Sequence, residues 1–124
     1  WGVANHDSSG SQHTMTGTMP NSNFNWTTNN DWYHFAITLN GSNGDKRVYI
    51  DGGLNMNSTN SNFASVTYTN YQHEARLYIG GAPGNSNQIF KGDISTSRFY
   101  NNKVLTAAEV LNNYNMEKSI HGKP

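Results

Sequence analysis

Alternating apolar and polar positions are clearest in the middle of the chain. Residues Trp32–Leu39 alternate strictly, so that Tyr33, Phe35, Ile37 and Leu39 fall on one face of an extended chain. Residues Arg47–Asp51 repeat the pattern, with Val48 and Ile50 on one face and Tyr49 on the other. The connection over residues 40–45 contains two Asn-Gly dipeptides, which favour tight turns because both residues tolerate positive φ. The pattern therefore predicts a β-hairpin that ends at Gly52 and Gly53.

Shorter runs with the same period predict further strands on both sides of this hairpin. Their positions are Val3, Gln12–Thr18, Leu54–Met56, Phe63–Thr69, Ala75–Ile79 and Ile89–Tyr100. The last of these is the longest and is interrupted by Gly92. Two polar segments, residues 19–31 and 81–88, are interpreted as loops because Asn, Ser and Pro break the alternation there.

One helix is predicted, close to the C-terminus. The segment TAAEVLNNYNME starts with a capping box, in which Thr106 caps the first turn and Glu109 reaches back to it. Val110, Leu111 and Tyr114 form a narrow apolar stripe, so we expect the helix to pack on the rim of a sheet. The last residues, KSIHGKP, are expected to fray. Many short strands and one late helix predict an all-β protein, an antiparallel β-sandwich.

Composition supports a folded domain and argues against several classes of protein. The 124 residues fit one small domain. Leu, Ile, Val and Phe make up only 21 residues, but zero net charge and 12% aromatic residues argue against disorder. A neutral chain is not expected to bind nucleic acid, and no apolar run is long enough to insert into a membrane. Without cysteine the chain has no disulfide and no Cys-bound zinc.

Several short motifs resemble a known superfamily when they are taken in order. They are WYHFAIT, a short Asn/Gly turn, VYIDG, LYIG, FKGDI and RFYNNKVLTAAEV, and they cover roughly residues 31–114. In this order they resemble the laminin-G-like domains of the concanavalin A-like lectin/glucanase superfamily. The resemblance implies a jelly-roll β-sandwich, in which Gly-Asp-Ile lies on a late strand and the Leu-Thr segment heads a short helix.

The resemblance also concerns the extent of the domain. Such domains commonly carry more strands before the Trp-x-His-x-Ala segment than 31 residues supply. We therefore expect residues 1–124 to form a single laminin-G-like domain that lacks some of its N-terminal strands. An upstream segment or a neighbouring chain would complete the sheet. A chain that opens on Trp1 is interpreted as a processed product or as part of a longer protein.

Catalysis is not expected. Some members of the superfamily are glucanases, and glycoside cleavage needs two carboxyl groups about 5–9.5 Å apart. A strand would supply them at positions i and i+2, but no two acidic residues of this chain have that spacing. Glu109 is already used by the helix cap, and no Gly-x-Ser-x-Gly segment offers a serine nucleophile. The remaining enzyme hypothesis is a fragment of a glycosidase whose catalytic strand lies upstream.

No cofactor is expected, and the histidines do not indicate a metal site. His6, His13, His34, His73 and His121 share no helix face, and His34 is expected to be a structural residue with satisfied hydrogen bonds. Calcium remains an alternative, because it binds loop oxygens and some relatives bind it beside the sugar site. The candidates are Asp7 with Asn5, Asn29–Asp31 and Asn43–Asp45. We favour hairpin chemistry for the last segment and a strand-end role for Asp31.

Sugar binding requires an aromatic surface for the apolar face of a pyranose and polar loop residues for its hydroxyl groups. Two predicted loops and one turn have this composition. The candidate ligand-binding residues are Trp26, Asn29, Asp31, Tyr71, His73, Asn85 and Asn87. Covering the core is an equally good interpretation for Trp26, and with 20 Asn residues any loop of this chain resembles a lectin loop.

These observations predict a non-catalytic recognition module that binds carbohydrate or glycoprotein and is extracellular or displayed on a cell or virion surface. The alternative is a structural jelly-roll module of a large assembly, such as a virion or a surface filament, with neighbouring protein chains as partners. The missing early strands and the neutral, Asn-rich composition favour the alternative, because such surfaces pack together with little charge to desolvate.

Overall fold

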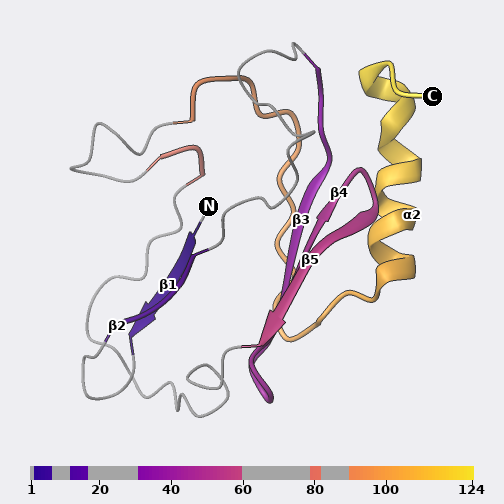
Figure 1. The fold of residues 1–124 in the computed structure, drawn as a ribbon. Helices are drawn as coiled ribbons and strands as arrows, with labels where there is room; N and C mark the ends of the chain where they lie inside the picture. Colours follow the sequence, from indigo (N-terminus) through magenta and orange to yellow (C-terminus); the bar gives the residue numbers. More distant parts are fainter. Residues whose placement is uncertain (1, 7–11, 17–30, 60–78, 82–89) are drawn as a thin grey trace.

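The computed structural model describes residues 2–6, 12–16, 31–59, 79–81 and 90–124 (Figure 1). Near the N-terminus, β1 (Gly2–His6) pairs antiparallel with β2 (Gln12–Thr16). A second antiparallel sheet has the strand order β3 (Phe35–Asn40), β4 (Asp45–Ile50) and β5 (Gly53–Thr59). The predictions of strands at Val3, from Gln12 onward and on both sides of the Asn-Gly turn are confirmed.

The turn between β3 and β4 is built by the chemistry that its sequence predicts. Gly44 has a φ of +71°, and its N–H donates to the carbonyl oxygen of Asn40 at 2.8 Å. The side-chain oxygens of Asn40 and Asn43 accept hydrogen bonds from the backbone N–H groups of Ser42 and Asp45. Each amide therefore replaces a missing backbone partner within the turn, which fixes the pairing of Asn40 with Asp45.

Strand β5 is longer than its sequence predicts. The apolar pattern ends at Met56, but pairing with β4 continues through Asn57 and Ser58 to Thr59. Asn is a poor strand residue, so the ladder of hydrogen bonds to β4 outweighs its intrinsic preference here. The register between β4 and β5 shifts between Val48 and Tyr49, as in a β-bulge.

The core lies on both faces of β4. Val48 and Tyr49 are neighbours that point to opposite faces, and they are only 0% and 1% exposed. In Figure 1, the helix α2 (Ala107–Glu117) lies along β4 and β5 on one side of the sheet, and the β1–β2 pair lies on the other. A central strand covered on both faces is what a layered β fold requires.

The helix α2 starts at the capping box predicted for it. The Oγ1 of Thr106 accepts from the N–H of Glu109 at 3.3 Å, and the Glu109 carboxylate accepts from the N–H of Thr106 at 2.9 Å. Gly52, in the β4–β5 turn, is buried with a φ of +77°, and a Cβ there would lie 2.8 Å from Leu111 Cδ1. The helix thus packs on the rim of the sheet as predicted, because a glycine allows this close approach.

The prediction that the C-terminal tail frays is wrong. Residues Lys118–His121 form a short 3₁₀ helix, η1, which ends at Gly122 in the left-handed region. The ring of His121 lies 4.7 Å from that of Trp32, and the Nζ of Lys123 lies 2.9 Å from Asp31 Oδ2. These long-range contacts hold the tail against the start of β3, and no local sequence rule anticipates them.

The longest predicted strand, Ile89–Tyr100, is also not a strand in the part of it that the structure describes, residues 90–100. These residues are exposed. Arg98 forms an ion pair with Glu117, and the Tyr100 hydroxyl accepts from Asn113 Nδ2 at 3.1 Å. Alternation describes which side chains share a face, but a strand also needs a neighbouring backbone. The strand predicted over 63–69 lies outside the described residues, as does all of the one predicted over 75–79 except Ile79.

Candidate functional site

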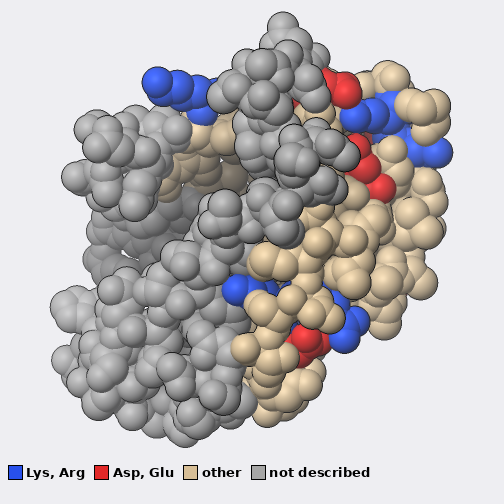
Figure 2. Space-filling view, viewed as in Figure 1, with Lys and Arg blue, Asp and Glu red and all other residues tan. Residues whose placement is uncertain are grey.

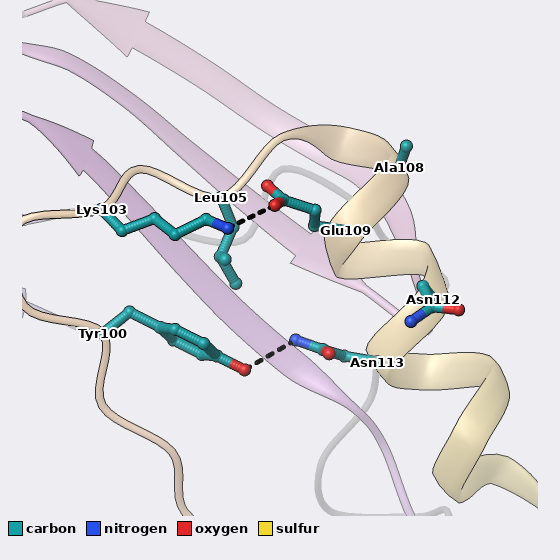
Figure 3. Close-up of a pocket in the computed structure, with 7 residues that line it drawn as sticks. All are labelled: Tyr100, Lys103, Leu105, Ala108, Glu109, Asn112 and Asn113. Carbon is teal, nitrogen blue, oxygen red and sulfur yellow. Dashed lines mark hydrogen bonds and ion pairs between the residues drawn. The ribbon is translucent and has the colours of Figure 1, made fainter.

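A shallow pocket lies between the N-terminal half of α2 and the segment that leads into it (Figure 3). Its volume is about 320 Å³. The residues that line it come from residues 100–105 and from the first turns of the helix: Tyr100, Lys103, Leu105, Ala108, Glu109, Asn112 and Asn113. The lining therefore combines an aromatic ring, an ion pair and two amides with the apolar side chains of Leu105 and Ala108.

The ion pair is anchored by the helix cap. Glu109 Oε1 accepts a hydrogen bond from Lys103 Nζ, while Oε2 accepts from the backbone N–H of Thr106 at 2.9 Å and from its hydroxyl at 3.1 Å. These hydrogen bonds lower the pKa of Glu109 to about 2. The bond from Lys103 contributes most, followed by those from Thr106. The carboxylate is thus ionised at neutral pH and held in one position.

The polar groups opposite the ion pair are amides and a phenol. Tyr100 is exposed, and its hydroxyl oxygen accepts from Asn113, so the ring is oriented by the helix. Asn112 is exposed, and its Nδ2 makes a 3.6 Å contact with Met116 Sδ. Its carbonyl oxygen has no partner among the described residues. These groups supply both donors and acceptors, as hydroxyl-bearing ligands require.

The described residues form no large surface patch that is only basic or only acidic. On the face shown in Figure 2, acidic and basic side chains lie next to one another. The ion pairs among the described residues follow the same arrangement: Asp45 with Arg47, Glu117 with Arg98, Glu109 with Lys103, and Asp31 and Asp51 with Lys123. Nucleic-acid binding would instead need a basic patch.

Of the seven ligand-binding residues that the sequence suggests, only Asp31 is described. The other six, Trp26, Asn29, Tyr71, His73, Asn85 and Asn87, lie outside the described residues. Asp31 accepts from Lys123 Nζ at 2.9 Å and from the N–H of Trp32 at 3.0 Å. The hydrogen bond from Lys123 is the main cause that lowers the pKa of Asp31. Asp31 therefore holds the C-terminal tail.

Lys123 is a shared partner of two carboxylates. Its Nζ also lies 3.5 Å from Asp51 Oδ2 and 4.5 Å from the centre of the Tyr33 ring. Burial lowers the pKa of Lys123, but the hydrogen bonds and charges of Asp31 and Asp51 outweigh this and raise it. This cluster lies beyond the C-terminal end of α2, whereas the pocket lies at residues 108–113 of the helix, so the two are separate sites.

Among the other calcium candidates, Asn43 and Asp45 have structural roles, as Asp31 does. Asn43 and Asp45 belong to the β3–β4 turn, and Asp45 forms an ion pair with Arg47 at 3.0 Å, which confirms the hairpin interpretation. Asp7 and Asn29 lie outside the described residues. Among the residues that are described, no three His, Asp or Glu side chains gather as metal ligands would. No described helix is long and apolar enough to cross a bilayer.

His34 is structural, but its hydrogen bonds are not all satisfied. Its backbone N–H and carbonyl both bond to Asp51, at 2.9 and 2.8 Å, and its ring lies 5.9 Å from that of Tyr114 on α2. Its Nδ1 is buried without a partner among the described residues, which corrects the prediction of a satisfied histidine. Burial is the main cause that lowers the pKa of His34.

The sequence interpretation missed the pocket. It assigned Tyr100 to a strand and treated Glu109 as a cap alone. The spacing of the helix residues was the available signal, since Ala108 with Asn112 and Glu109 with Asn113 are i, i+4 pairs on adjoining lines of one face. An aromatic residue shortly before such a face marks a place where a loop folds back on the helix.

The chain belongs to the concanavalin A-like lectin/glucanase superfamily. The family model described as "Laminin_G_3: Concanavalin A-like lectin/glucanases superfamily" matches residues 4–111, which confirms the resemblance. The fold of this superfamily is a jelly-roll β-sandwich, of which the described residues include two antiparallel sheets and the C-terminal helix.

Among solved structures, the chain is similar to residues 221–444 of an S-layer domain-containing protein from Clostridium thermocellum ATCC 27405. The TM-score is 0.55 and the sequence identity is 23%, and the similarity covers 83% of this chain and 45% of that one. The chain thus spans less than half of that structure, and at this identity the similarity shows the fold alone. No curated protein matches the chain.

Proposed function

We propose that this domain is a non-catalytic recognition module of a surface protein, and that it binds carbohydrate or the glycan of a glycoprotein. The observation that carries the proposal is the pocket between residues 100–105 and α2, called the α2 pocket below. The Tyr100 ring, two amides and an ion pair line it. Aromatic rings cover the apolar face of a sugar, and amides and charged groups bond its hydroxyls. Membership of a superfamily that includes lectins supports this use.

The state of Glu109 supports a binding role over a catalytic one. A glycosidase needs one carboxyl group whose pKa is raised, so that it can donate a proton at neutral pH, and a second one nearby. Glu109 is the only carboxyl group among the described residues that line the pocket, and its pKa of about 2 departs in the opposite direction. A carboxylate held by Lys103 and Thr106 serves as a fixed acceptor and is a poor acid.

A glycan array probed with the domain, followed by calorimetric titration of the best ligand, tests this proposal. We expect Tyr100→Ala to weaken binding at least about tenfold, as loss of an aromatic at the centre of a binding site does. Phe99→Ala is the matched control, because Phe99 is the neighbouring aromatic and does not line the pocket. Equal losses for both variants, or no glycan bound by a folded domain, would contradict the proposal.

A second candidate is a structural module that packs against other chains of a surface assembly. Three exposed apolar side chains favour it: Phe99, Ile120 and Met116 are 78%, 75% and 66% exposed. Phe99 lies between Arg98 and Tyr100, whose side chains bond to the helix that carries Met116. The fold similarity to an S-layer domain-containing protein adds support for a cell-surface or extracellular location.

Sedimentation velocity over a range of concentrations tests this second candidate. Self-association that Phe99→Ala and Met116→Ala reduce would support it, and a monomer at every concentration would count against it. Phe99 and Met116 do not line the pocket, so their substitution should leave it intact. The glycan and assembly functions are therefore separable by mutation.

A further inference from the structure

We propose that the α2 pocket selects a neutral, hydroxyl-rich sugar residue at the end of a glycan and discriminates against anionic sugars. This inference rests on the proposed carbohydrate binding and names the ligand class for the same site. It follows from three features of the pocket: how its charges are paired, which uncharged polar groups it offers and how large it is.

The charges of the pocket cancel within it. Among the described residues that line it, Lys103 and Glu109 are the only ionised groups, and they bind each other. A sulfate or a sugar carboxylate approaching Lys103 would meet the Glu109 carboxylate beside it. That carboxylate cannot swing away without breaking its bonds to the N–H and hydroxyl of Thr106, which cap the helix. An anionic ligand would therefore have to compete with Glu109 for Lys103.

The uncharged polar groups suit hydroxyls instead. The Asn112 carbonyl oxygen has no partner among the described residues, and the Tyr100 hydroxyl uses its oxygen as an acceptor from Asn113, which leaves its O–H to donate. Each sugar hydroxyl can both donate and accept, so it can satisfy one group of each kind. An anionic oxygen only accepts, so it could not donate to the exposed Asn112 carbonyl, which would stay hydrated by water.

The size of the pocket limits how much of a glycan it contacts. A volume of about 320 Å³ lies at the small end of the roughly 300–1,000 Å³ typical of ligand sites. The pocket therefore fits one sugar ring over Tyr100, and the rest of a glycan would extend into solvent. This favours recognition of a terminal residue.

Two charge variants test the inference in opposite directions. Glu109→Gln removes the negative charge and keeps the capping box, because Gln can replace Glu at that position. Lys103→Gln removes the positive charge and leaves Glu109 unpaired. The dissociation constants of two matched ligands, methyl glucoside and methyl glucuronide, are measured by ligand-observed NMR for the wild type and both variants. Circular dichroism confirms folding of each variant.

We expect the wild type to prefer methyl glucoside. Glu109→Gln should shift the preference toward methyl glucuronide by a factor of about two to five, as for other exposed charge pairs, and Lys103→Gln should shift it away. Both shifts should shrink in high salt. A wild type that prefers the glucuronide, or variants that leave the ratio unchanged, would overturn the inference while carbohydrate binding stood. Failure of both sugars and of every glycan on the array would instead contradict the proposed function.

Discussion

The β3–β4 hairpin and residues 90–100 have the same alternating sequence pattern, yet they form different structures. The hairpin contains its own turn, so Gly44, Asn40 and Asn43 bring the two strands together within a few residues. In residues 90–100, the Phe90 N–H donates to the Gly80 carbonyl oxygen at 2.7 Å at the start of the segment, and further along the side chains of Arg98 and Tyr100 bond to α2. The comparison shows that alternation becomes a strand where local chemistry also delivers a neighbouring backbone.

The largest expected effect on stability comes from Gly52, in the β4–β5 turn that packs against α2. Gly52→Ala places a methyl group 2.8 Å from Leu111 Cδ1 at a residue with a φ of +77°. We expect the free energy of unfolding to fall by roughly 3 kcal/mol, from overpacking and backbone strain together. Gly41→Ala is the control, because no atom lies within 4 Å of its added Cβ. Urea titrations that give equal losses for the two variants would contradict the packing of α2 on this turn.

A smaller effect is expected at Thr106, the N-cap of α2, which follows residues 90–100 in the chain. Thr106→Ala removes the side chain that accepts from the N–H of Glu109. The free energy of unfolding should fall by about 1 kcal/mol, the usual cost of losing such a cap. Thr106→Ser keeps the hydroxyl and should recover most of the loss. Identical urea midpoints for wild type and Thr106→Ala would show that the cap does not stabilise the helix.

The free energy of unfolding is expected to depend on pH through His34, which lies just before β3 and faces Tyr114 of α2. Burial is the main cause that lowers the pKa of His34 below its ordinary 6.5, partly opposed by the charges of Glu117 and Asp51. The unfolded chain therefore binds this proton more readily, so stability is highest above about pH 6.5 and decreases as the pH falls below it. His34→Phe keeps a ring against Tyr114 and should flatten the urea midpoint between pH 7.5 and pH 5.5. His121→Phe, which leaves His34 in place, should retain the slope.

The smallest expected effect concerns the position of one ring. Tyr100→Phe removes the hydroxyl that accepts from Asn113, a bond that is exposed and contributes little to folding. We expect the urea midpoint to stay nearly constant, while the dissociation constant for a neutral sugar rises about threefold because the ring loses its bond to Asn113 and the sugar loses the O–H donor. An unchanged dissociation constant would show that the ring does not need this hydrogen bond.

Local rules predicted the parts of the fold that are built from neighbouring residues. The Asn-Gly turn, the β3 and β4 strands and the Thr106 capping box are all confirmed, and so is the superfamily. The tail was predicted wrongly because its stability comes from Trp32, Asp31 and Asp51, which are far away in sequence. Such contacts form only once the chain has folded, so no local pattern reports them.

The same reason explains the site. The sequence interpretation looked for sugar ligands in Asn-rich loops, because composition alone indicates loops. The pocket arises where Tyr100 and Lys103 fold back on the helix that begins at residue 107, and it depends on the bonds to Asn113 and Glu109. Its residue types were visible in the sequence, but their meeting point was not.

The central claim is that the α2 pocket holds the ligand, and mapping by NMR tests it most directly. Uniformly ¹⁵N-labelled domain is titrated with a neutral methyl glycoside, and amide shifts are followed across the chain. We predict that the side-chain amides of Asn112 and Asn113 and the backbone of residues 100–113 shift together, while the β3–β4 turn stays unchanged. Shifts confined to residues 21–31 and 81–88, with none in the pocket, would contradict the claim and return the site to the Asn-rich loops.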